Sequence, residues 1–163
     1  DVTKDGLDWA MEASGLEELE LRETLLALYW ELPAYREVPE MLATLKARGY
    51  STGILSNGSP DMLDGAVDFA GVRTWLDAVL SVEDVGVFKP ADVVYSMVGT
   101  RFGTARDEVL FVSSNGWDVA SATAYGFQPA WVNRAGEPMD RLPDPPGHVL
   151  DDLSGIATLA GTL

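Results

Sequence analysis

One short stretch of the sequence decides the fold, because it takes the chain from a strand into a helix. Residues 109–118 read VLFVSSNGWD. The apolar run at 109–112 is too short for a helix and predicts a buried strand. Small polar residues follow it, and such residues favour turns and helix N-termini. We therefore expect a strand, a tight turn and a helix over about residues 118–125.

Strands and helices alternate in the same way along most of the remaining chain. Stretches with apolar residues at helical spacing are separated by short apolar runs. This alternation is typical of a parallel sheet covered by helices on both faces, so we expect a three-layer α/β sandwich. The expected strands lie at 50–55, 78–81, 109–112 and 130–133 and near Val149, and the expected helices lie from Pro39, at 60–70, at 92–102, at 118–125 and from Leu153.

The N-terminal part of the chain differs from the rest, because its pattern is helical only. Apolar residues recur at helical spacing before and after Gly15, and Pro33 is expected to end the second of these helices. We expect residues 1–33 to form a small helical unit and residues 34–163 to form the α/β body.

The composition excludes several classes of function. The chain has 163 residues, of which 26 are acidic and 11 are basic, so its net charge is −15. This charge repels nucleic acids and anionic membranes, and we expect neither as a partner. The absence of cysteine excludes disulfides, thiolate metal sites and a cysteine nucleophile. Neither a leader nor an apolar stretch of ~20 residues is visible, so we expect a cytoplasmic protein.

Polar residues follow three of the expected strands. Residues 55–60 read LSNGSP, residues 87–90 read VFKP, and residues 112–118 read VSSNGWD. Ligands of an open parallel sheet bind beyond the carboxyl ends of its strands, so we expect these segments to converge on a site for a small anion. Taken alone, each has an ordinary explanation: a turn with a helix cap, a solvated lysine, and an aspartate at a helix N-terminus.

Together these segments resemble the haloacid dehalogenase superfamily, and within it the L-2-haloacid dehalogenases. The similar residues are SNGSP at 56–60, Lys89-Pro90 with Tyr95 further on, and FVSSNGWD at 111–118. The resemblance covers essentially the whole chain, and residues 1–33 are similar to part of the family's helical cap. It implies a Rossmann-like parallel sheet with a partial cap.

The resemblance also implies a reaction. An aspartate attacks C2 of a small L-2-haloalkanoate and displaces the halide, which gives an ester. Water then hydrolyses the ester to a 2-hydroxy acid. Such nucleophilic catalysis divides one difficult step into two easier ones. No cofactor is implied.

Four residues would act in this chemistry if the family's roles are carried over. Lys89 would hold the carboxylates of the nucleophile and the substrate. Asp118 would pair with Lys89 and help to orient the hydrolytic water. Ser113 and Asn115 would order the pocket and this water.

Four further residues would bind the substrate according to the same resemblance. Ser56 would bind its carboxylate, and Asn57 would help to hold the leaving halide. Tyr95 would help to order the pocket, and Trp117 would line its apolar side.

One segment distinguishes dehalogenases from the phosphatases that they resemble. The phosphatases hold Mg²⁺ with additional acidic residues, because this ion prefers carboxylate oxygens. Here the corresponding positions are Ser113, Ser114 and Asn115, and only Asp118 is acidic. We therefore expect no metal, and a phosphatase is the less favoured alternative.

The family's first motif has no match in the chain. This motif is a strand that ends in the nucleophilic aspartate, followed later by an arginine that binds halide. None of the early aspartates follows an apolar strand, and no arginine precedes Arg22. We assign no nucleophile and expect the body to lack its first, central strand, which would expose the edges of two others. The chain would be part of a longer enzyme, an inactive truncated product, or an interaction module completed by a partner or by a homodimer.

Overall fold

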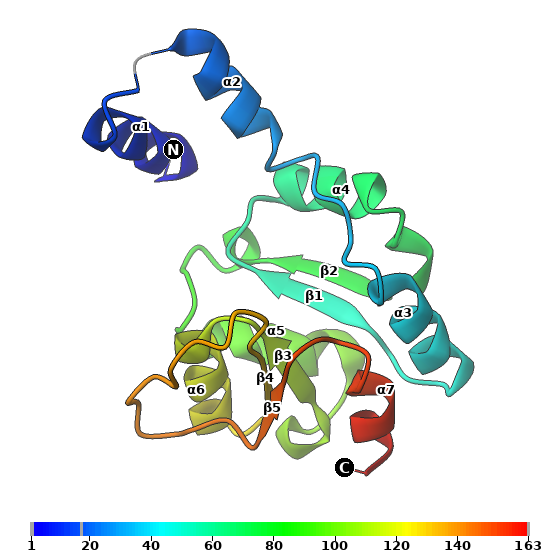
Figure 1. Cartoon of the computed structure of the whole chain (residues 1–163). Coiled ribbons are helices and arrows are strands. Elements are labelled where there is room, and N and C mark those ends of the chain that lie inside the picture. Colours follow the sequence, from blue (N-terminus) through cyan, green and yellow to red (C-terminus); the bar gives the residue numbers. More distant parts are fainter. Residues whose placement is uncertain (1, 17, 163) are drawn as a thin grey trace.

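The computed structural model describes residues 2–16 and 18–162, and the expected alternation of strands and helices is present in them (Figure 1). Short 3₁₀ turns connect several elements. The helices are α1 (Val2–Ala13), α2 (Leu19–Ala27), α3 (Val38–Ala47), α4 (Pro60–Phe69), α5 (Asp92–Phe102), α6 (Gly116–Tyr125) and α7 (Ile156–Leu159), and the strands are β1 (Gly53–Ser56), β2 (Ala78–Ser81), β3 (Leu110–Ser113), β4 (Gln128–Val132) and β5 (His148–Leu150).

The strands form two parallel sheets. One sheet has the order β1-β2, with Ser56 opposite Ser81, and the other has the order β3-β4-β5, with Ser113 opposite Trp131. Within the described residues, β1 and β3 do not pair with each other, so each keeps one edge without a strand beside it. All the carboxyl ends in one sheet point the same way, which brings the loops after β1 and β2 together.

Helices cover both faces of these sheets, which gives the expected three layers. Leu55 packs against an aromatic cluster formed by α5, β3 and α6, whereas its neighbour Ile54 packs against α3 and α4. Successive side chains of a strand point to opposite faces of the sheet, so Leu55 and Ile54 show that helices cover both faces of β1. On the second sheet, Ala130 is fully buried against α3 and α7.

The first two helices form a unit that extends away from the sheets (Figure 1). Arg22 of α2 forms an ion pair with Asp8 of α1, which joins the two helices. Helix α2 ends at Ala27, whereas the sequence predicted that it would reach Pro33. The indole of Trp30 instead packs on the backbone of α4, so close to Gly65 that a Cβ there would lie 2.5 Å from Trp30 Cδ1.

Several element boundaries differ from those expected. Strand β1 begins at Gly53 rather than at residue 50, because backbone N–H groups before it donate elsewhere instead of to a strand. The N–H of Tyr50 donates to the Leu45 carbonyl, and the N–H of Thr52 donates to the Asp77 side chain. Helix α6 begins two residues earlier than expected, at Gly116. None of the helices in residues 2–16 and 18–162 has the length and hydropathy needed to cross a membrane.

Candidate active site

A buried ion pair lies where the loops after the strands meet. Lys89, from the loop after β2, places Nζ 2.6 Å from Oδ2 of Asp118 in the first turn of α6. The side chains of Lys89 and Asp118 are 9% and 2% exposed. Lys89 Nζ also lies 3.3 Å from the carbonyl oxygen of Leu55 in β1. Lys89 therefore links β1 of the first sheet to α6, the helix that follows β3 of the second sheet.

The Asp118 carboxylate accepts hydrogen bonds at both oxygens. The Tyr95 hydroxyl donates to Oδ1 over 2.8 Å, and the Ser113 hydroxyl donates to Oδ2 over 3.2 Å, beside the bond from Lys89. An ammonium group has three donors, and the described residues accept two of those of Lys89. The third is available to an anionic ligand.

Tyr95 is held in its protonated form. Its side chain is fully buried, and burial raises the pKa of its hydroxyl well above the ordinary value. The hydrogen bond to the Asp118 carboxylate raises this pKa further, because ionisation would place two negative charges side by side. Tyr95 therefore acts as a fixed donor to Asp118 at neutral pH.

Aromatic rings surround the ion pair and limit its access to water. Lys89 Nζ lies 5.7 Å from the ring centroid of Phe111 and 6.0 Å from that of Trp117. The ring of Tyr95 packs edge-on against Phe111 and Phe127. A lysine among aromatic faces gains cation–π attraction, and the apolar setting strengthens its attraction for an anion.

The loop after β1 is tied to the lysine loop through Asn57. The N–H of Lys89 donates to Asn57 Oδ1 over 3.0 Å. This bond fixes the orientation of the side-chain amide, so its NH₂ group remains a donor for a ligand. The Ser56 hydroxyl accepts from the N–H of Gly58, and that of Ser59 caps α4 by accepting from Met62.

The turn after β3 presents a second helix N-terminus. Asn115 is the N-cap residue of α6, and its backbone N–H donates to the Ser113 hydroxyl. The carbonyl of Ser114 accepts from the indole N–H of Trp131. The free N–H groups of a helix N-terminus favour negative charge nearby, so α4 and α6 add to the attraction of Lys89 for an anion.

The structure brings the sequence-predicted residues to one region but joins them unequally. Lys89, Tyr95, Ser113 and Asp118 share one hydrogen-bonded network. Asn57 and Trp117 contact Lys89, through its backbone and its ammonium group respectively. The hydroxyl of Ser56 and the backbone N–H of Asn115 instead form hydrogen bonds within their own turns.

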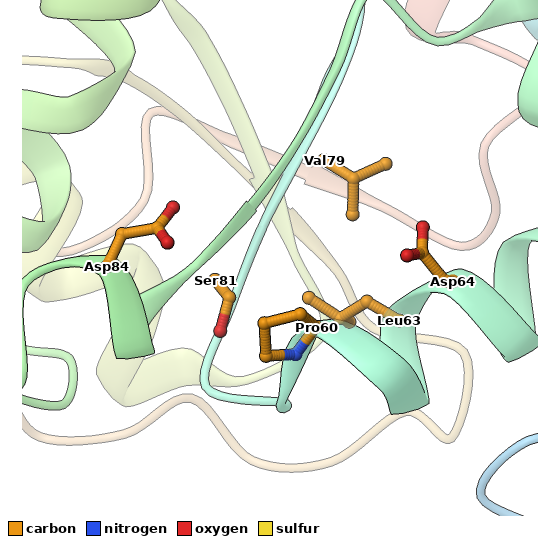
Figure 2. A pocket seen from close by; sticks show the side chains of 6 residues that line it. All are labelled: Pro60, Leu63, Asp64, Val79, Ser81 and Asp84. Atoms are coloured by element: carbon orange, nitrogen blue, oxygen red, sulfur yellow. The ribbon is translucent and has the colours of Figure 1, made fainter.

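Two participants were not among the site residues predicted from the sequence. The first is the carbonyl of Leu55, which no side-chain pattern could indicate. The second is Ser81, whose hydroxyl donates to the carbonyl of Gly58. Ser81 is the polar residue at the end of the otherwise apolar strand expected at 78–81, and this position could have indicated that it belongs to the site. Ser81 also lines a hollow of about 200 Å³ beside α4 (Figure 2).

No group of three histidine, cysteine, aspartate or glutamate side chains that could hold a metal ion occurs in residues 2–16 and 18–162. At the ion pair itself, Asp118 is the one carboxylate of the described network, and it already accepts hydrogen bonds from Lys89, Tyr95 and Ser113. A single carboxylate beside an ammonium group is a poor set of ligands for Mg²⁺.

Known proteins resemble this chain over nearly its whole length. The (S)-2-haloacid dehalogenase of Pseudomonas sp. (strain YL) is 38% identical over 162 residues, which are 99% of this chain and 70% of that protein. The (S)-2-haloacid dehalogenase 4A of Burkholderia cepacia is 36% identical over 95% of this chain and 68% of its own length. The L-2-haloacid dehalogenase of Xanthobacter autotrophicus, solved with chloropropionic acid covalently bound, has a TM-score of 0.90 at 31% identity, over 99% of this chain and 75% of that one.

The family described as haloacid dehalogenase-like hydrolases matches residues 3–126. This match includes the loop that carries Lys89 and the helix α6 that carries Asp118. The chain belongs to the haloacid dehalogenase-like hydrolases.

Proposed function

We propose that the protein takes part in the hydrolytic dehalogenation of small L-2-haloalkanoic acids. The observation that carries this proposal is the buried pair of Lys89 and Asp118, with one ammonium donor left over at the carboxyl ends of the strands. A lysine so placed attracts the carboxylate of an anionic substrate. The names of the related (S)-2-haloacid dehalogenases support the substrate class.

The proposed reaction has two balanced steps. A carboxylate oxygen forms a bond to C2 of the substrate while the carbon–halogen bond breaks, and the halide leaves with the bonding electrons. Water then adds to the ester carbonyl, so the carboxylate is released with the 2-hydroxy acid and one proton. We assign neither the nucleophilic carboxylate nor a halide-binding arginine to a residue of this chain.

Each residue of the network has a proposed part in these steps. Lys89 holds the carboxylates, and Asp118 keeps its ammonium group in place. Ser113 and Asn115 order the turn, and Oδ1 of Asp118 retains a lone pair that can accept from the hydrolytic water. The proposal that Oδ1 can accept from water is supported by its hydrogen bonding, since it accepts one bond in the described residues, from Tyr95.

The substrate pocket is the other half of the proposal. The donors of Ser56 and Asn57 face the substrate carboxylate and the departing halide. The half-exposed indole of Trp117 covers the apolar part of the substrate. The Tyr95 hydroxyl fixes the Asp118 carboxylate by donating a hydrogen bond to Oδ1.

Four broader points complete the proposal. Residues 1–33 act as a helical cap over the body at 34–163. The enzyme needs no cofactor or metal, works in the cytoplasm, and forms a homodimer.

The first test is halide release from L-2-chloropropionate. The intact mass of the naturally expressed protein is first compared with 17.6 kDa, the mass of this sequence, and the assay uses the form found. Lys89→Ala and Asp118→Asn are expected to abolish release. Lys46→Ala and Asp77→Asn, which change an ion pair with half-exposed side chains, are the matched controls and should retain it.

The outcomes of this assay separate the alternatives. Retained activity in both Lys89→Ala and Asp118→Asn would overturn the assigned roles. Phosphate release from p-nitrophenyl phosphate with Mg²⁺, without halide release, would replace the proposal by a phosphatase. Release of neither product would indicate an inactive or interaction form of the fold.

A further inference from the structure

The hydroxyl of Ser81 joins the end of β2 to the loop that follows β1. Ser81 is the last residue of β2, it lies opposite Ser56 in the sheet, and it is 3% exposed. Its Oγ lies 2.7 Å from the carbonyl oxygen of Gly58, to which it donates, and accepts from the N–H of Glu83 over 3.2 Å. In Figure 2 it lies next to Pro60, the first residue of α4.

The loop that Ser81 holds is the one that carries Ser56 and Asn57. Within this loop, the N–H of Gly58 donates to the Ser56 hydroxyl over 3.0 Å. Asn57, between them, accepts from the backbone of Lys89. A shift of the Gly58 carbonyl would therefore move the Ser56 hydroxyl, the Asn57 amide and the backbone of the lysine loop together.

We infer that Ser81 is a positioning residue for the anion site. Its hydrogen bond to Gly58 fixes the loop at 56–59, so that Ser56 and Asn57 present their donors to the ligand. Through Asn57, the same bond also keeps the backbone of Lys89 in place. Ser81 lies one strand away from the ion pair and does not touch Lys89 or Asp118 through any bond in the described structure. The identity of the ligand rests on the proposed function, but the control of the loop by Ser81 does not.

The chain contains a matched control for this inference at the opposite end of the same strands. Thr52, just before β1, is 8% exposed, and its hydroxyl donates to the carbonyl of Trp75 before β2. Ser81 and Thr52 are thus buried hydroxyls that cross-link the same sheet, one at each end. Thr52 is far along β1 from the loop at 56–59, so its loss should cost stability without moving that loop.

The decisive measurement is residue-resolved amide hydrogen exchange in Ser81→Ala, Ser81→Thr and Thr52→Val. In Ser81→Ala, we expect the N–H groups of Gly58 and Lys89 to exchange about tenfold faster, as the loss of one hydrogen bond implies. Ser81→Thr keeps the hydroxyl and should restore slow exchange. Equal effects of Ser81→Ala and Thr52→Val on these two amides would overturn the inference.

Kinetics of halide release give the second readout. Ser81→Ala should raise KM for L-2-chloropropionate about tenfold and change kcat by less than about threefold, because it weakens ligand positioning. Thr52→Val should leave KM unchanged. An unchanged KM in an active Ser81→Ala enzyme would also overturn the inference. If no form releases halide but the exchange pattern is as expected, the proposed function fails and the role of Ser81 stands.

Discussion

The ammonium group of Lys89 and the carboxylate of Asp118 lie 2.6 Å apart and are both nearly closed off from solvent. Removing one partner of such a pair leaves an uncompensated buried charge, which costs about 3–5 kcal/mol. We expect Lys89→Met and Asp118→Asn each to destabilise the fold by about this amount. The double variant should lose much less than the sum, and urea unfolding of the four proteins measures the difference.

The pair of Lys46 and Asp77 is the control for this cycle, because its side chains are 32% and 35% exposed. Its coupling should be about 1 kcal/mol or less, since water screens exposed pairs. Additive effects at Lys89 and Asp118 would contradict the view that this pair acts as one buried unit.

The protonated state of Tyr95 predicts how stability changes at alkaline pH. Burial and the neighbouring Asp118 raise its pKa in the fold above the value of about 10 in the unfolded chain. The folded state therefore binds more protons than the unfolded state above this pH, and stability falls as the pH rises. The contribution of Tyr95 is fully present below pH ~10 and is lost towards its raised pKa.

Tyr95→Phe tests this directly. The variant should be less stable than the parent at pH 8, because an oxygen of Asp118 loses its donor. The difference in unfolding free energy should shrink as the pH rises beyond about 10. Chemical denaturation between pH 8 and 11 measures it, and a difference independent of pH would refute the assignment.

The contact of Trp30 with Gly65 predicts that a single methyl group disturbs the junction between α2 and the body. A Cβ at residue 65 would lie 2.5 Å from Trp30 Cδ1 and 3.2 Å from Trp30 Cβ. Because Trp30 Cβ lies next to the backbone, the side chain cannot simply swing away. Gly65→Ala should destabilise the fold by about 1–3 kcal/mol, measured by thermal unfolding.

Gly6 in α1 is the matched glycine, since nothing lies within 4 Å of a Cβ built there. Gly6→Ala should stabilise its helix by up to about 1 kcal/mol. Combining Gly65→Ala with Trp30→Ala should relieve the clash, so a double variant less stable than both singles would argue against this packing.

Asp77 predicts a loss of stability in acid. The ammonium group of Lys46, and then the N–H of Thr52, lower the pKa of this carboxyl in the fold. Its contribution is present above the unfolded pKa of about 3.9 and is lost as the pH falls through the lowered value. Asp77→Asn should be less stable than the parent at pH 6, and the two should converge below pH ~4. Urea unfolding from pH 6 to pH 2.5 follows this, and Lys46→Met should reduce the effect.

Local signals predicted some elements residue for residue. The strand expected at 78–81 matches β2, because a short apolar run defines it. The helix expected at 92–102 matches α5, because Gly103, with φ +66°, ends it. The end of α2 was wrong by several residues, because the packing of Trp30 on α4 decides it. No local pattern contains a contact between residues 35 positions apart.

The same division holds for the site. The polar segments after the strands could be predicted, because the carboxyl ends of parallel strands collect such residues. The backbone partners of Lys89 and Ser81, which are the carbonyls of Leu55 and Gly58, could not, because they belong to other elements than the two side chains. Sequence patterns describe side chains, and backbone acceptors are invisible in them.

The separation of the two sheets has a consequence for behaviour at high concentration. In the part of the chain that the structure describes, β1 and β3 each keep a row of backbone groups without a strand beside it, and such rows recruit extended segments of other molecules. The net charge of −15 opposes non-specific association of copies at neutral pH. For a polypeptide of these 163 residues, protonation of carboxylates in acid weakens this repulsion while the strand edges stay open, so lowering the pH should promote self-association through the strands.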